Sequence, residues 1–102
     1  MSSQIRVAVV TGAGTGIGKS AALTLLADGY RVGLVGRRRD LLDKTAADAG
    51  AAAANALVLP ADVAKPESVK ALFAKLQQTW GRLDLLFNDD VTNRFRVDAE
   101  AP

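Results

Sequence analysis

Residues 7–20 read VAVVTGAGTGIGKS, and this stretch decides the fold. From Ile5 to Val10 the chain is apolar and β-prone apart from Arg6, which predicts a strand. Glycines then occupy every second position from 12 to 18, and a helix-compatible run follows. Because glycine has no Cβ, such a turn brings backbone N–H groups and the positive end of a helix dipole close to a ligand. The stretch therefore predicts a strand, a glycine turn that binds phosphate, and a helix.

Three nucleotide-binding patterns share these ingredients. The pattern G-x-G-x-x-G from Gly12 fails, because Ile17 stands where its last glycine is required. The P-loop pattern G-x-x-x-x-G-K-[ST] fits except that Ala13 replaces its first glycine, and the acidic strand end LLFND at 85–89 could help to hold Mg²⁺. A P-loop nucleoside triphosphatase is therefore an alternative. The third pattern, T-G-x-x-x-G-x-G, is met in full by residues 11–18.

This third pattern resembles the cofactor turn of the short-chain dehydrogenases/reductases. The resemblance covers about residues 5–88, and we expect residues 1–88 to form a dinucleotide-binding half-domain and 89–102 an irregular tail. It implies an α/β fold with a partial Rossmann-like parallel sheet of strand order 3-2-1-4, two helices on one face and the third on the other. The implied activity is hydride transfer between NADP(H) and an alcohol or carbonyl substrate.

Composition excludes several other functions. The chain has 102 residues, enough for one domain, and it contains no cysteine and no histidine, so thiolate chemistry, a serine triad and an ordinary zinc site are excluded. A net charge of +2 does not favour nucleic acid as a partner. No apolar run approaches the roughly 20 residues of a membrane helix, and the N-terminus lacks a signal-peptide pattern. A cytoplasmic protein is the expectation.

Apolar periodicity outlines the remaining elements. The first helix has its apolar stripe at 17, 21, 22, 25 and 26 and stops at Asp28-Gly29. A second strand at 31–35 follows, then an amphipathic helix whose stripe includes Leu41, Leu42 and Thr45. A third strand at 57–60, a helix that begins near Pro66, and a fourth strand at 83–88 complete the pattern.

The residues after the second strand bear on the choice of cofactor. In dinucleotide-binding folds an acidic residue here binds the ribose 2′-hydroxyl, whereas an arginine accommodates a 2′-phosphate. This chain has Gly36 at the acidic position and then Arg37, Arg38 and Arg39. We expect NADP rather than NAD, with Arg37 as the first candidate for the phosphate contact and Arg38 as the second. The alternative is that these arginines only open a solvated helix.

The resemblance also places cofactor contacts after the third and fourth strands. Asp62-Val63 matches an adenine contact, although an aspartate that caps the next turn fits the chemistry equally. The pattern G-x-L-D-x-L-x-N is met from Gly81 to Asn88, but Asp89 and Asp90 then replace small residues, and their carboxylates would repel the cofactor phosphates. The full set of expected cofactor-binding residues is Gly12, Thr15, Gly16, Ile17, Gly18, Arg37, Arg38, Asp62, Val63 and Asn88.

No catalytic or metal-binding residue is assigned. The resemblance implies a catalytic Tyr with a Lys four residues later and a Ser, but the only tyrosine is Tyr30, which Leu34 follows at that spacing. We therefore expect no turnover from these 102 residues, and a non-catalytic nucleotide-binding or interaction module stays open. The fourth strand would be an open apolar edge, which predicts either a truncated, clipped or frame-shifted piece of a longer reductase or a homo-oligomer formed through that edge.

Overall fold

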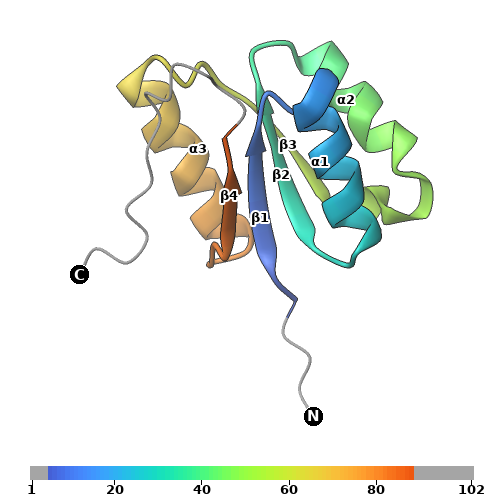
Figure 1. The fold of residues 1–102 in the computed structure, drawn as a ribbon. Helices are drawn as coiled ribbons and strands as arrows, with labels where there is room; N and C mark the ends of the chain where they lie inside the picture. The colour runs from blue at the N-terminus through green and yellow to red at the C-terminus, as the bar shows by residue number, and fades with distance from the viewer. Residues whose placement is uncertain (1–4, 89–102) are drawn as a thin grey trace.

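A computed structural model describes residues 5–88 of the chain, and in it helices cover both faces of a parallel sheet (Figure 1). The strands are β1 (Val7–Thr11), β2 (Arg31–Gly36), β3 (Ala56–Pro60) and β4 (Leu85–Phe87), in the spatial order β3-β2-β1-β4. The helices are α1 (Gly16–Ala27), α2 (Arg39–Asp48) and α3 (Pro66–Thr79), with a 3₁₀ helix η1 (Gly50–Asn55) before β3. The predicted strand order is confirmed. The tail predicted for 89–102, with Asp89 and Asp90, lies outside the described residues.

Strand β1 is the centre of the sheet. All five of its residues are buried, because it pairs with β2 on one side and β4 on the other while helices cover both faces. It extends to Thr11, one residue beyond the predicted end, since Thr11 still pairs with Val35 of β2. Ile5, predicted to start the strand, precedes it and is 42% exposed.

The alternation of side chains along β1 divides the core into two. Ala8 and Val10 point to the face covered by α1 and α2, where they pack with Ala22, Leu26 and Leu42. Val7 and Val9 point to the other face, where they pack with Leu72 and Leu76 of α3. Figure 1 shows α1 and α2 on one side of the sheet and α3 on the other, as the sequence predicts for right-handed crossovers.

The buried stripe of α1 differs from the prediction at one position. Gly18, Ala22 and Leu26 are the buried residues of this helix, whereas Ile17, predicted as a core residue, is 68% exposed. The helix starts only at Gly16, so Ile17 lies in its first turn, about 100° around the axis from Gly18. Ile17 therefore lies at the surface beside the glycine turn and does not belong to the core.

Strand β4 is shorter than the predicted 83–88. Only Leu85 to Phe87 pair with β1, while Leu83 packs against the core on the α3 face. Within residues 5–88, β4 has β1 as its only neighbouring strand, and Leu85 is 40% exposed. The open apolar edge that the sequence predicts is therefore present in the described part of the chain. In that same part, no helix combines the length and the apolar character needed to cross a membrane.

Candidate functional site

The glycine turn between β1 and α1 has a backbone that only glycine accommodates. Gly12 and Gly16 have φ angles of 66° and 59°, in the left-handed region that other residues avoid. A Cβ on Gly18 would lie 2.1 Å from the carbonyl oxygen of Gly12, and a Cβ on Gly14 would lie 2.8 Å from Cβ of Leu41. The turn thus folds back against its own helix and against α2, with Gly12 and Gly16 left at the surface.

Hydrogen bonds fix the turn from both sides. The Ala13 N–H donates to the Val35 carbonyl oxygen of β2 (3.1 Å), and the hydroxyl of Thr45 in α2 donates to the Ala13 carbonyl oxygen (2.9 Å). Thr45 is completely buried. At the end of β1, the Thr11 hydroxyl donates to Oδ1 of Asn88 (2.9 Å), which brings the predicted residue Asn88 to the turn. These hydrogen bonds therefore tie the turn to β2, to α2 and to the residue that follows β4.

No side chain among the described residues caps the amino end of α1 or neutralises its positive dipole. Its N-cap residue, Thr15, makes no side-chain capping hydrogen bond, and the first turn contains no acidic residue. The first N–H groups of a helix have no partner within it and carry its positive dipole end. The backbone around Gly16 to Gly18 is thus suited to an anion, and the cofactor contacts of Thr15, Gly16, Ile17 and Gly18 stay a prediction.

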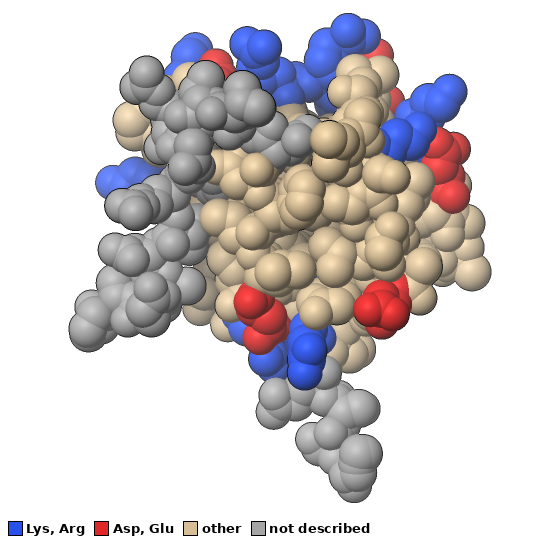
Figure 2. All heavy atoms as spheres, in the orientation of Figure 1, with Lys and Arg blue, Asp and Glu red and all other residues tan. Residues whose placement is uncertain are grey.

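A pocket joins this turn to the end of β2. It has a volume of about 160 Å³ and is lined by residues of the turn and of the β2–α2 connection: Gly12, Gly14, Thr15, Gly36, Arg37, Arg38, Leu41 and Leu42. Figure 2 shows lysine and arginine side chains gathered along the upper edge of the molecule, where the strands of Figure 1 end. The pocket therefore offers a positive environment to a phosphate group.

The arginines after β2 are not equivalent. Arg38 donates two hydrogen bonds to the Asp40 carboxylate, from Nε at 3.2 Å and from the terminal nitrogen at 2.8 Å, and these hold the pKa of Asp40 below its ordinary value. Arg39 lies 3.8 Å from Asp43, one helical turn along α2, and does not line the pocket. No residue within 5–88 pairs with Arg37. Arg37 is thus the pocket cation available to a ligand.

The position of Lys19 distinguishes this site from a P-loop. Its Nζ lies 2.7 Å from a carboxylate oxygen of Asp48 at the end of α2, and this contact lowers the pKa of Asp48. A P-loop lysine must reach the phosphates that its loop holds. Because Lys19 is engaged by α2 and does not line the pocket, the P-loop alternative is not favoured.

Asp62 and Val63 follow β3 at the same edge of the sheet but do not line the pocket. Oδ1 of Asp62 accepts a hydrogen bond from the Ala64 N–H (3.0 Å), which is the capping geometry named as the alternative. Val63 packs against the core on the α3 face. The structure thus brings together the glycine turn, the arginines and Asn88, while Asp62 and Val63 stay apart from the pocket.

Several site residues were missed by the sequence prediction. Gly14, Gly36, Leu41 and Leu42 line the pocket and Thr45 anchors the turn. The signal for Thr45 was a polar residue within the apolar stripe of the second helix. A buried hydroxyl there needs a hydrogen-bond partner, and the carbonyl groups of the neighbouring turn supply it.

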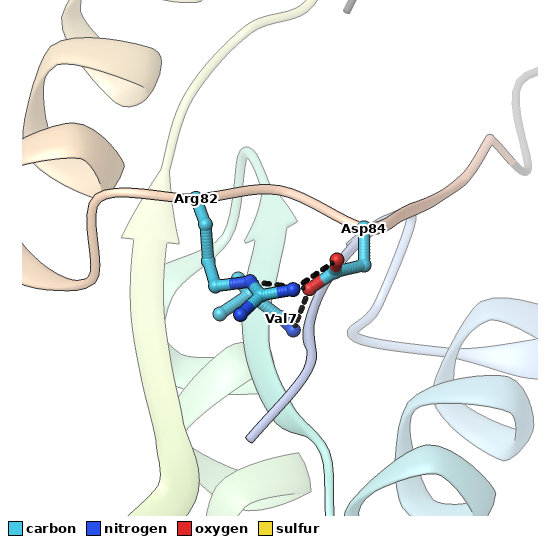
Figure 3. Close-up of polar contacts among 3 residues, drawn as sticks. All are labelled: Val7, Arg82 and Asp84. Atoms are coloured by element: carbon cyan, nitrogen blue, oxygen red, sulfur yellow. Dashed lines mark hydrogen bonds and ion pairs between the residues drawn. The ribbon is translucent and has the colours of Figure 1, made fainter. Parts of the chain in front are cut away.

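The opposite edge of the sheet is held by a different polar cluster (Figure 3). Oδ2 of Asp84 accepts a hydrogen bond from the Val7 N–H (2.8 Å), and Arg82 pairs with both carboxylate oxygens of Asp84. The Asp84 N–H in turn donates to the Val7 carbonyl oxygen (2.8 Å). Arg82 first, and then the Val7 N–H, lower the pKa of Asp84. This residue therefore fixes β4 to β1 and lies far from the pocket, at the amino ends of the strands.

Two further observations limit the chemistry of the site. Tyr30 precedes β2 at its amino end and packs against the core on the α1 face, so it lies at the edge of the sheet opposite the pocket. Among residues 5–88, no three His, Cys, Asp or Glu side chains form a group that could hold a metal ion. Neither a tyrosine nor such a metal-binding group therefore lies at the pocket within the described residues.

Comparison with known proteins agrees with this geometry. Residues 6–95 match the short chain dehydrogenase family. An uncharacterized oxidoreductase of Staphylococcus aureus (strain MRSA252) is 43% identical over 83 residues, which are 81% of this chain and 35% of the relative. The chain thus spans about a third of the length of the curated relatives it matches.

Solved structures give the same result. A 3-ketoacyl-(acyl-carrier-protein) reductase from Brucella melitensis, complexed with NADH, superposes with a TM-score of 0.72 at 32% identity, over 79% of this chain and 32% of that chain. An alcohol dehydrogenase from the archaeon Thermococcus sibiricus, complexed with 5-hydroxy-NADP, superposes with a TM-score of 0.76 at 34% identity, over 81% and 36% of the two chains.

Proposed function

This chain belongs to the short chain dehydrogenase family, and we propose that it is the cofactor-binding portion of an NADP(H)-dependent oxidoreductase. The fold and the family support a nicotinamide dinucleotide as the ligand, since the similar reductase and alcohol dehydrogenase were solved with such molecules. The substrate of the whole enzyme is an alcohol or a carbonyl compound. The cytoplasmic location and association through the β4 edge stay predictions.

The glycine turn is suited to the pyrophosphate of the cofactor. Its surface glycines leave the backbone accessible, and the first turn of α1 presents N–H groups and no acidic side chain. Because Ala13 is fixed through both its N–H and its carbonyl group, the turn loses little conformational freedom when the ligand binds. These features support Gly12, Thr15, Gly16, Ile17 and Gly18 as cofactor-binding residues.

The single observation that carries the choice of NADP(H) is the position of Arg37. This side chain lines the same pocket as the glycine turn, follows Gly36, and has no ion-pair partner within residues 5–88. An acidic residue at the end of β2 would favour the 2′-hydroxyl of NAD, whereas Arg37 offers a charged donor to a 2′-phosphate. We assign Arg37 to the 2′-phosphate contact. Asn88 accepts a hydrogen bond from the Thr11 hydroxyl, and we assign it to the cofactor site where β1 meets the glycine turn.

Asp62 and Val63 have a weaker case as adenine contacts. Within residues 5–88 only Oδ1 of Asp62 has a hydrogen-bond donor, so Oδ2 could accept one from an exocyclic amine. The Ala61 N–H donates to the Gly36 carbonyl oxygen (2.8 Å), which keeps this segment beside the end of β2. The adenine contact is therefore proposed for Asp62 and Val63, outside the pocket itself.

The chain's own residues bind and orient the dinucleotide. The bound cofactor would supply or accept a hydride at its nicotinamide ring, and the proton transfer at the substrate oxygen requires a catalytic group. Tyr30, the only tyrosine, lies at the opposite edge of the sheet, so we expect the 102-residue chain to bind NADP(H) without turning over an alcohol or a ketone. Detectable steady-state reduction by the purified chain would refute this expectation.

A fluorescence titration with NADPH tests the proposal, with NADH and ATP as competitors. Loss of a hydrogen bond to a charged group predicts that Arg37→Ala weakens NADPH binding about tenfold and leaves NADH binding nearly unchanged. Arg39→Ala is the matched control, because it removes the same charge two residues away, outside the pocket. The absence of saturable NADPH binding, tighter binding of ATP than of NADPH, or equal effects of the two variants would contradict the proposal.

A further inference from the structure

The rim of the pocket contains an ion pair that the cofactor assignment does not use. Arg38 lines the pocket with Arg37, but its guanidinium is turned to Asp40, with both hydrogen bonds within 3.2 Å. Both side chains are largely exposed, so solvent and a ligand can reach this pair. The second arginine of the pocket is therefore neutralised by an acidic residue of the same connection.

We propose that Asp40 is a specificity-determining residue that competes with the 2′-phosphate of the cofactor for Arg38. The inference rests on the proposed NADP(H) function and adds that Arg38 is a second phosphate-binding arginine, which its ion pair with Asp40 keeps from the phosphate. Asp40 accepts two hydrogen bonds from Arg38, so a phosphomonoester that enters the pocket meets one unpaired arginine and one neutralised pair. The carboxylate thus limits the preference for NADP(H) over NAD(H).

The geometry favours competition over simple support of Arg38. Asp40 stands in the first turn of α2, where the helix dipole stabilises its negative charge, and the contact with Arg38 lowers its pKa. It therefore stays ionised at neutral pH and repels a nearby phosphate. Removal of its charge frees a planar five-donor group at the pocket rim, and this group is well suited to a second phosphate contact.

Asp43 is a matched control within the same helix. It is also an exposed aspartate that lies near an arginine, Arg39, but neither residue lines the pocket. Asp40→Asn and Asp43→Asn therefore change the net charge equally, and only the first change frees an arginine of the pocket. A difference between the two variants reports on the local contact and is not caused by the overall charge.

The experiment measures the binding of NADPH, NADH, adenosine 2′,5′-bisphosphate and 5′-AMP to the full 102-residue chain and to both variants. The expected result is that Asp40→Asn tightens binding of the two ligands with a 2′-phosphate about threefold to fivefold, the range that release of an exposed ion pair allows, and leaves the other two unchanged. Asp43→Asn should leave all four affinities unchanged. The double variant Arg38→Gln with Asp40→Asn should lose the gain.

Each remaining outcome overturns a defined part of the reasoning. If the wild-type chain binds none of the four ligands, the proposed function and this inference both fall. If the wild type binds NADPH but Asp40→Asn and Asp43→Asn behave alike, the inference alone is wrong. If Asp40→Asn weakens NADPH binding, Asp40 supports Arg38 in place and does not compete for it, and the inference is again wrong.

Discussion

The hydroxyl of Thr45 gives the sharpest test of how the glycine turn is held. This side chain is completely buried in α2, and its Oγ lies 2.9 Å from the carbonyl oxygen of Ala13, 32 residues away in the sequence. Thr45→Val replaces the hydroxyl with a methyl group of similar size. The Ala13 carbonyl would then lose its bond to α2, while the packing of the side chain would stay nearly the same.

The magnitude follows from the cost of an unsatisfied buried acceptor. Such a group typically costs about 1–3 kcal/mol, and in a domain of this size 1 kcal/mol shifts the melting temperature by about 4–8 °C. We therefore expect Thr45→Val to lower the melting temperature by roughly 5–20 °C. Thr45→Ser keeps the hydroxyl and loses one methyl group, a change of about 1 kcal/mol, so it should retain most of the stability.

The assay is thermal unfolding followed by circular dichroism, with NADPH affinity measured on the same samples below the transition. If Thr45 also positions the turn, Thr45→Val should weaken NADPH binding while the protein is still folded, and Thr45→Ser should restore the binding. A Thr45→Val chain with the melting temperature of the wild type would refute the role of this hydrogen bond. Equal losses of affinity in both variants would refute the positioning role.

Two further predictions concern the turn and the opposite edge of the sheet. In Gly18→Ala the new Cβ would stand 2.1 Å from the Gly12 carbonyl oxygen, so the turn must open. We expect urea unfolding to show a loss of stability of about 1–3 kcal/mol from overpacking, and NADPH affinity to fall more than tenfold. An unchanged stability and an unchanged affinity would contradict this close approach. Arg82 and the Val7 N–H lower the pKa of the Asp84 carboxyl group. The ionised carboxylate therefore stabilises the fold fully above the ordinary aspartate pKa of about 3.9, and this stabilisation is lost as the pH falls through the lower pKa of the folded state. The urea midpoint of wild type should therefore exceed that of Asp84→Asn near neutral pH and converge with it at acidic pH, and a difference independent of pH would be evidence against the contact.

The order of elements and the pairing of turn and arginines could be predicted from the sequence because both depend on local patterns. Alternating glycines after an apolar strand define the turn, and right-handed crossovers then place the end of the second strand beside it. Gly12 and Arg37 consequently meet in one pocket although 25 positions separate them. The short fourth strand was predicted as well, with an excess of residues at both ends.

The remaining features depend on contacts between distant residues. Ile17 is apolar and fits the helical period, yet it is exposed because the buried face passes through Gly18, which has no side chain. Nothing in the sequence indicates that Arg38 pairs with Asp40 while Arg37 has no partner within residues 5–88. Asp84 belongs to the family pattern, but its role as the link to Val7 becomes evident only when β4 lies beside β1.

The most direct test of the central claim is a nuclear magnetic resonance titration of the ¹⁵N-labelled 102-residue chain with NADPH. If the glycine turn and Arg37 hold the dinucleotide, the backbone amide signals of Gly12, Gly14, Thr15, Ile17 and Arg37 should shift and saturate together, while those of the Asp84 edge should not move. Saturating shifts confined to other residues, or no shifts at all in a folded chain, would contradict the account.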